Sequence, residues 1–77
     1  MNQNWQLHIS TDPKVMFGKP VVKGTRIPVE LILEKIAHGE SVEYLLQSYP
    51  RLTREDITAC QFYALQSVKN DLVFAIA

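Results

Sequence analysis

Three sets of apolar residues at helical spacing, separated by a glycine and a proline, dominate residues 29–70 of this chain. The first set falls at i, i+3, i+4, i+7 and i+8: Val29, Ile32, Leu33, Ile36 and Ala37. This spacing lines one face of an α-helix. Pro28 suits the first turn of that helix, and Gly39 is placed to end it. We therefore expect an amphipathic helix that begins beside Pro28.

Two more helices are expected after Gly39. Ser41 is a good N-cap for a second helix, Pro50 would stop it, and its apolar face would consist of Val42, Leu45, Leu46 and Tyr49. Thr53 then opens a third helix, with Asp56 at the position that completes a capping box. The expected core face of the third helix is Ile57, Cys60, Ala64, Leu65 and Val68.

The chain before these helices has a different pattern. Trp5, Leu7 and Ile9 alternate with polar residues, which predicts a short half-buried strand. His8 then falls on the wetter face as a surface residue with no partner nearby. Val21 and Val22 supply a second extended piece, so we expect a small sheet or an exchanged arm. The predicted class is mainly α.

With 77 residues, of which 47% are apolar, the chain is expected to fold as a single domain, 1–77. It divides into an extended lead-in (7–28), a three-helix unit (29–70) and an apolar tail (71–77). A chain of this size buries a limited core and leaves little room for a deep enzyme pocket. We expect no enzyme activity, and a homodimer that completes the core.

No residue pattern predicts a catalytic, metal or cofactor site. Cys60 is the only cysteine, and packing is the expected role of its thiol. His8 and His38 are far apart in the chain, and Glu30 and Glu34 suit a solvated helix face. No apolar run reaches the length of a membrane span, and the N-terminus lacks a signal-peptide pattern. We expect a cytoplasmic protein.

Charge is balanced overall but unevenly placed. Residues 1–29 carry four Lys or Arg and one Asp (+3), and residues 30–48 carry one Lys and four Glu (−3). The basic part includes the stretch GKPVVKGTRIPV, residues 18–29. Its order Lys23-Gly24-Thr25 is not that of a phosphate-binding P-loop. The basic side chains of this stretch serve either as phosphate contacts or as solvated turn residues.

The chain resembles the prokaryotic family called domain of unknown function 433. The resemblance rests on the His-Ile-x-x-Asp-Pro start, on residues 18–29, and on Leu-Thr-x-Glu-Asp-Ile before the last helix, and it covers about residues 8–64. It implies a homeodomain-like helix-turn-helix bundle with a short N-terminal β segment. It also implies the role of a VapB-type antitoxin, encoded beside a PIN-like nuclease toxin.

These observations define two sets of site residues. In a helix-turn-helix the start of the presented helix meets the bases and basic groups nearby hold phosphates. The expected DNA-binding residues are Arg54 and Thr58 at base edges and Lys19, Lys23, Arg26 and Arg51 at phosphates. The expected partner or dimer interface consists of Phe62, Tyr63, Leu72, Val73, Phe74 and Ile76. The alternative is a protein-interaction module that binds no DNA, and the tail docks either on a partner or on its own core.

Overall fold

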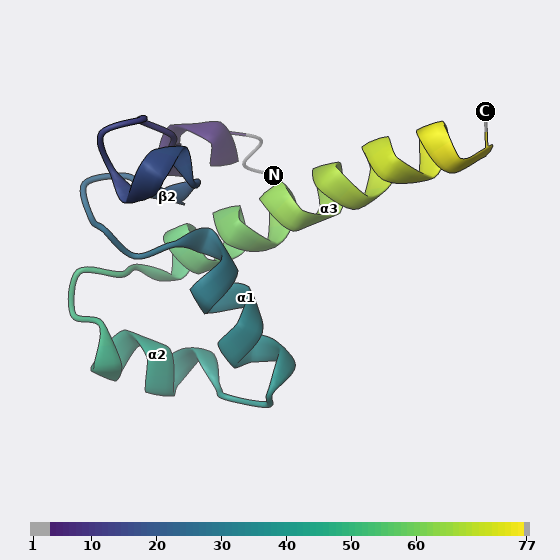
Figure 1. Ribbon diagram of the computed structural model, residues 1–77. Coiled ribbons are helices and arrows are strands. Elements are labelled where there is room, and N and C mark those ends of the chain that lie inside the picture. The colour runs from purple at the N-terminus through teal and green to yellow at the C-terminus, as the bar shows by residue number, and fades with distance from the viewer. Residues whose placement is uncertain (1–3, 77) are drawn as a thin grey trace.

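A computed structural model describes the backbone of residues 4–76 and the side chains of residues 4–70 (Figure 1). The elements in chain order are η1 (Trp5–His8), β1 (Ile9–Ser10), η2 (Met16–Gly18), β2 (Val21–Val22), α1 (Val29–Ala37), α2 (Val42–Ser48) and α3 (Arg54–Ile76), where η marks a 3₁₀-helix. The described chain is thus mainly helical, with three α-helices and a short two-stranded sheet near the N-terminus. This confirms the predicted class.

The sheet is antiparallel and pairs Ile9 with Val22 and Ser10 with Val21. The turn that follows β2 is fixed by Thr25, whose hydroxyl donates to the Val22 carbonyl at 2.7 Å and accepts from the Ile27 N–H at 3.0 Å. Gly24 occupies a left-handed conformation there, with φ of +80°, which glycine adopts without steric cost. Much of the GKPVVKGTRIPV pattern therefore encodes this turn.

Both predicted caps are present. The Ser41 hydroxyl accepts from the Tyr44 N–H at 3.1 Å at the start of α2. At the start of α3, Thr53 Oγ1 accepts from the Asp56 N–H at 3.1 Å while Asp56 Oδ2 accepts from the Thr53 N–H at 3.0 Å. These bonds satisfy backbone donors that have no partner inside the helix. The sequence signals for both helix starts are confirmed.

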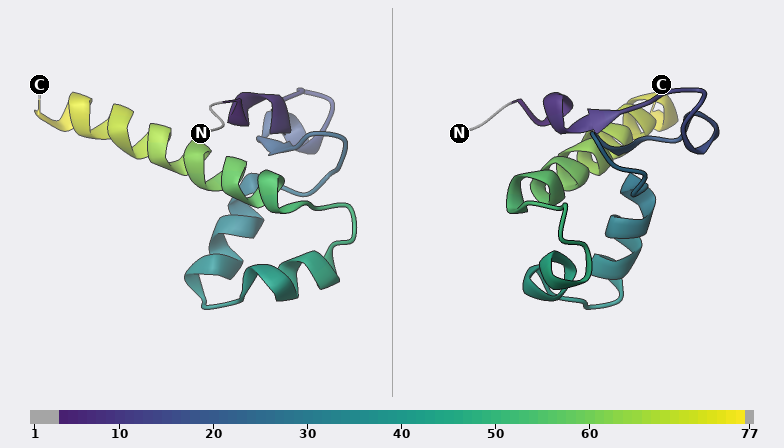
Figure 2. Two further views of the ribbon diagram at one scale, coloured as in Figure 1. Left: turned by 180° about the vertical axis from the view of Figure 1, so that it is seen from behind. Right: turned by 90° about the vertical axis from the view of Figure 1, so that its left-hand side faces the viewer.

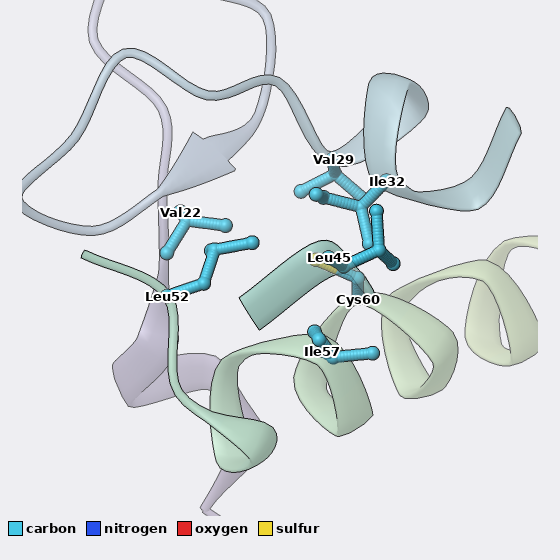
Figure 3. Close-up of a cluster of buried hydrophobic side chains, with 7 residues drawn as sticks. All are labelled: Val22, Val29, Ile32, Leu45, Leu52, Ile57 and Cys60. Carbon is cyan, nitrogen blue, oxygen red and sulfur yellow. The ribbon is translucent and has the colours of Figure 1, made fainter. Parts of the chain in front are cut away.

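The core joins residues from all three α-helices to the strand β2 (Figure 3). Its central cluster is Val22, Val29, Ile32, Leu45, Leu52, Ile57 and Cys60. Truncating a fully buried residue such as Ile32 to Ala costs about 2–5 kcal/mol in cores of this kind. Burial raises the pKa of the Cys60 thiol to about 12, with a further contribution from the charge of Asp56. This cysteine packs in the core, as predicted.

Helix α3 has 23 residues, and its second half projects away from the other elements (Figures 1 and 2). Three predictions are corrected here. The backbone of residues 71–76 continues α3 and does not form a separate tail. Leu65 and Val68, predicted in the core, are 45% and 54% exposed, while Ala59 is buried. The other elements cover only the first turns of α3, so the core face of this helix cannot extend to residue 68. Ala37, at the end of α1, is also exposed.

Residues Trp5–His8 form a 3₁₀ turn where a strand was predicted. In a 3₁₀-helix the side chains at i and i+3 lie above one another. Trp5 and His8 consequently face the same way, toward α3, which a strand would not allow. Four residues of alternating polarity are too few to distinguish these two conformations.

The turn Met16–Gly18 has an unusual backbone. Met16 and Phe17 have φ of 51° and 58°, and Gly18 follows at 84°. The left-handed region costs a residue with a side chain about 1–2 kcal/mol. Phe17 nevertheless occupies it, and its side chain is 98% exposed.

Candidate functional site

The start of α3 is the point where the N-terminal segment, the β2 turn and the helices meet. His8 Nδ1 lies 2.8 Å from Asp56 Oδ1, so the ring N–H donates to the carboxylate. The His8 carbonyl in turn accepts from the Lys23 N–H at 2.8 Å. The expectation that His8 lacks a partner is therefore wrong. The partner is 48 positions away, a separation that local sequence patterns do not reveal.

Exposed basic residues occur in two loops and in the first turn of α3. Val22 and Leu52 lie side by side in the core (Figure 3). Lys23 directly follows Val22 in the sequence, and Arg51 directly precedes Leu52. Arg26 belongs to the same turn as Lys23, and Arg54 is the first residue of α3. We call Lys23, Arg26, Arg51 and Arg54 the basic end. It contains four of the six residues predicted to bind DNA.

Lys19 pairs with an acidic side chain. Its Nζ is 2.8 Å from Glu30 Oε1, in the first turn of α1. Both side chains are well exposed, so the pair is solvated and contributes little to stability. We do not count Lys19 in the basic end, because Glu30 pairs with it.

Two acidic side chains near Arg54 reduce the positive charge of the basic end. Arg54 donates to Glu43 Oε2 at 2.9 Å, and this hydrogen bond holds the pKa of the Glu43 carboxyl below its usual value. Glu55 is exposed beside Arg54. Because both Arg54 and Glu43 are exposed, the pair exchanges readily with other partners.

A hollow of about 140 Å³ lies between η1 and the first turns of α3. Its lining consists of Trp5, His8, Arg54, Glu55, Thr58, Ala59 and Phe62. A second hollow of about 280 Å³ adjoins it and is lined by Thr58, Gln61, Phe62 and Leu65. Thr58 and Phe62 border both hollows. Thr58, one of the two residues predicted at base edges, and Phe62, one of those predicted at a protein interface, thus share one surface.

Tyr63 does not share that surface. Its ring packs edge-to-face against Trp5 at a centroid distance of 6.1 Å, and it contacts the core cluster. Tyr63, predicted at a partner or dimer interface, thus packs within the chain, because η1 covers this side of α3. The side chains of Leu72, Val73, Phe74 and Ile76 lie outside the described residues.

Sequence reasoning missed Trp5 and His8 as parts of this surface. The only local signal of a further contact was Asp56. Its carboxylate has two oxygens, and the helix cap uses only one of them, so the other is available to a distant donor. Across residues 4–70, no three His, Cys, Asp or Glu side chains converge as metal ligands would. Within the described chain, no helix has the length and apolar character needed to cross a membrane.

Comparison with known proteins places this chain in a family. A family model described as protein of unknown function (DUF433) matches residues 9–64. The chain belongs to the DUF433 family. The shared residues include the β2 turn, the core and the start of α3, but not the projecting half of that helix.

Two relatives extend this result. The uncharacterized protein y4eO of Sinorhizobium fredii is 39% identical over 56 residues, which are 73% of this chain and 25% of that protein. The chain thus spans about a quarter of the length of this curated relative. The crystal structure of a DUF433 member from Anabaena variabilis is 34% identical, with a TM-score of 0.77 over 88% of this chain and 67% of that one. The DUF433 fold described above is therefore also found in a solved structure.

Proposed function

We propose that this DUF433 protein is an antitoxin-like, DNA-binding regulator that acts as a homodimer. In this proposal α2, the loop 49–53 and α3 form a helix-turn-helix of the homeodomain type, and the start of α3 meets the major groove. The observation that carries the proposal is the basic end. Lys23, Arg26 and Arg51 are exposed residues of two separate loops, and their neighbours Val22 and Leu52 pack in the same core cluster as Ile57 of α3.

The proposed role of each basic residue follows from its position in the fold. Lys23, Arg26 and Arg51 are exposed loop residues, which suits contact with phosphates. Arg54 is at the first helical position and can leave Glu43 for a guanine edge, where an arginine makes two parallel hydrogen bonds. The chain has no net charge, so a second subunit, which doubles these contacts, supports useful affinity.

The test is a fluorescence-anisotropy titration of the protein against a duplex from its own promoter and a scrambled duplex. We expect tighter binding to the promoter, and a loss of about 1–3 kcal/mol on that duplex alone for Arg54→Ala. Lys69→Ala is the matched control, because it removes an exposed charge of α3 far from the basic end. Equal binding to both duplexes at low salt would contradict the proposal.

A second candidate function is a protein-interaction module without DNA binding, favoured by the hollow beside Trp5 and Phe62. Aromatic residues are enriched where protein interfaces are centred, and a PIN-like nuclease is the partner that an antitoxin masks. The test is calorimetric titration with the product of the neighbouring reading frame, if it encodes such a nuclease. Binding that is lost in Phe62→Ala, combined with no DNA binding by the parent, would replace the regulator by this module.

A further inference from the structure

His8 makes two hydrogen bonds that connect separate parts of the basic end. Its carbonyl accepts from the Lys23 N–H at 2.8 Å, one residue beyond the pairing of β1 with β2. Its ring donates from Nδ1 to Asp56 Oδ1 at 2.8 Å, in the first turn of α3. A single residue therefore lies between the backbone of the β2 turn and the start of α3.

The connection continues into the loop before α3. The other oxygen of the same carboxylate, Asp56 Oδ2, accepts from the Thr53 N–H at 3.0 Å. Thr53 follows Arg51 by two positions. Hydrogen bonds thus run from Lys23 through His8 and Asp56 to the loop that carries Arg51, and this network reaches every segment that supplies the basic end.

The β2 turn is held together as one unit by its own hydrogen bonds. The Val22 N–H donates to the Ile27 carbonyl at 2.9 Å, and the Thr25 N–H donates to the Val22 carbonyl at 3.0 Å. Lys23 and Arg26 both lie between the ends of this turn. A contact that fixes Lys23 relative to α3 consequently constrains Arg26 as well.

We propose that His8 is a positioning residue for DNA binding, which holds the turn of Lys23 and Arg26 at a fixed distance and direction from the first turn of α3. This inference rests on the proposed function, in which the two turn residues meet phosphates and Arg54 meets a base edge. Phosphate contacts set the register of a protein on a duplex. A spacing that is fixed before binding lets the phosphate and base contacts form together at a low cost in conformational entropy.

Apolar packing of β2 does not supply the same restraint. Val22 packs in the central core cluster, but apolar contacts have no preferred direction. The bond from the His8 ring to the Asp56 carboxylate is directional, and the charge of the carboxylate strengthens it. The two side chains are 29% and 13% exposed, so solvent screens this pair less than the more exposed Arg54–Glu43 pair.

The salt dependence of DNA binding separates positioning from a purely structural role. A residue that only stabilised the fold would change the fraction of folded protein, and not the number of phosphates that the folded protein holds. The slope of log affinity against log salt reports that number. It is measured with the promoter duplex under conditions in which circular dichroism shows every variant to be folded.

The test variants are His8→Leu, which removes the ring donor, and His8→Asn, whose amide nitrogen branches from Cγ as Nδ1 does and can donate to Asp56. His38→Leu is the matched control, because the His38 ring also bonds through Nδ1, to the Glu34 carbonyl at 2.8 Å, at the end of α1. We expect the slope to fall in magnitude by about 0.9 for each phosphate contact that His8→Leu loses. His8→Asn and His38→Leu should keep the slope of the parent.

Hydrogen exchange measured by NMR without DNA reports on the turn directly. We expect the Lys23 amide to exchange faster in His8→Leu than in the parent, and at the rate of the parent in His8→Asn. The Thr25 amide, which is bonded within the turn, should keep its rate in both variants.

Three results would overturn this inference and leave the proposed function intact. They are a parent-like salt slope for His8→Leu, an unchanged exchange rate of the Lys23 amide in that variant, and a His8→Asn variant that behaves like His8→Leu. A parent that binds the promoter and the scrambled duplex equally would instead remove the proposed function, and this inference with it.

Discussion

The start of α3 and the Met16–Gly18 turn use their residues in opposite ways. At the start of α3, Asp56 caps the helix with one oxygen and holds His8 with the other, above a core that includes Cys60. In the turn, two residues with side chains adopt a backbone conformation that favours glycine, and Phe17 faces water. The first region is explained by the stability of the fold. The second is not, because the exposed side chain of Phe17 adds no packing that would offset the cost of its backbone conformation.

The largest expected effect tests the first region. Asp56→Ala removes both a helix cap and a charge-assisted hydrogen bond to His8, and we expect it to lower the free energy of unfolding by about 2–3 kcal/mol. Glu55→Ala, at the neighbouring exposed position, should change it by no more than about 0.5 kcal/mol. Urea denaturation followed by circular dichroism measures both. Equal effects would show that Asp56 does not link the two segments.

Alkaline pH tests the packing beneath the same region. The pKa of Cys60 is about 12 in the folded chain against an ordinary value of 9.0. Below pH 9 the thiol is protonated in both the folded and the unfolded chain, and its contribution to the free energy of unfolding is complete. Above pH 9 the unfolded chain loses the proton first, so stability falls by about 1.4 kcal/mol per pH unit until the folded thiol ionises. Cys60→Ala should lack this part of the slope, and identical slopes for parent and variant would contradict the burial.

A smaller effect, opposite in sign, is expected in the turn. Phe17→Gly relieves the left-handed strain and loses almost no packing, since the side chain is 98% exposed. Allowing for the extra freedom of glycine in the unfolded chain, we expect a gain of about 0.5–1 kcal/mol. Gly18→Ala, at φ of 84°, should instead destabilise the chain. Thermal unfolding measures both, and destabilisation by Phe17→Gly would mean that Phe17 supports the fold.

The smallest effect on stability is expected at the Arg54–Glu43 pair, which lies on the surface at the start of α3. Glu43→Gln should leave the unfolding curve unchanged, because exposed ion pairs contribute little. It should, however, free Arg54 and tighten promoter binding in the anisotropy titration. Weaker binding by this variant would indicate that Glu43 positions Arg54 for DNA.

The same contrast explains what the sequence could predict. Helix starts and the central core residues follow from local signals, such as Ser41, the Thr53–Asp56 capping box and the spacing of Val29 and Ile32. Contacts between distant segments do not: His8 meets Asp56, and Trp5 meets Tyr63, only because the 3₁₀ turn lies on α3. The predicted core face of α3 also extends too far, to Leu65 and Val68. The helical spacing of apolar residues continues beyond the part of α3 that the other elements cover.

The salt dependence of DNA binding tests the central claim most directly. The parent, a Lys23→Ala/Arg26→Ala/Arg51→Ala variant and the Lys69→Ala control are titrated against the promoter duplex at several salt concentrations. If these three residues hold phosphates, the slope of log affinity against log salt decreases in magnitude by about 0.9 for each contact removed from the triple variant. The slope of the control should match that of the parent. A triple variant with the slope of the parent would contradict the assignment of the basic end as a DNA-binding surface.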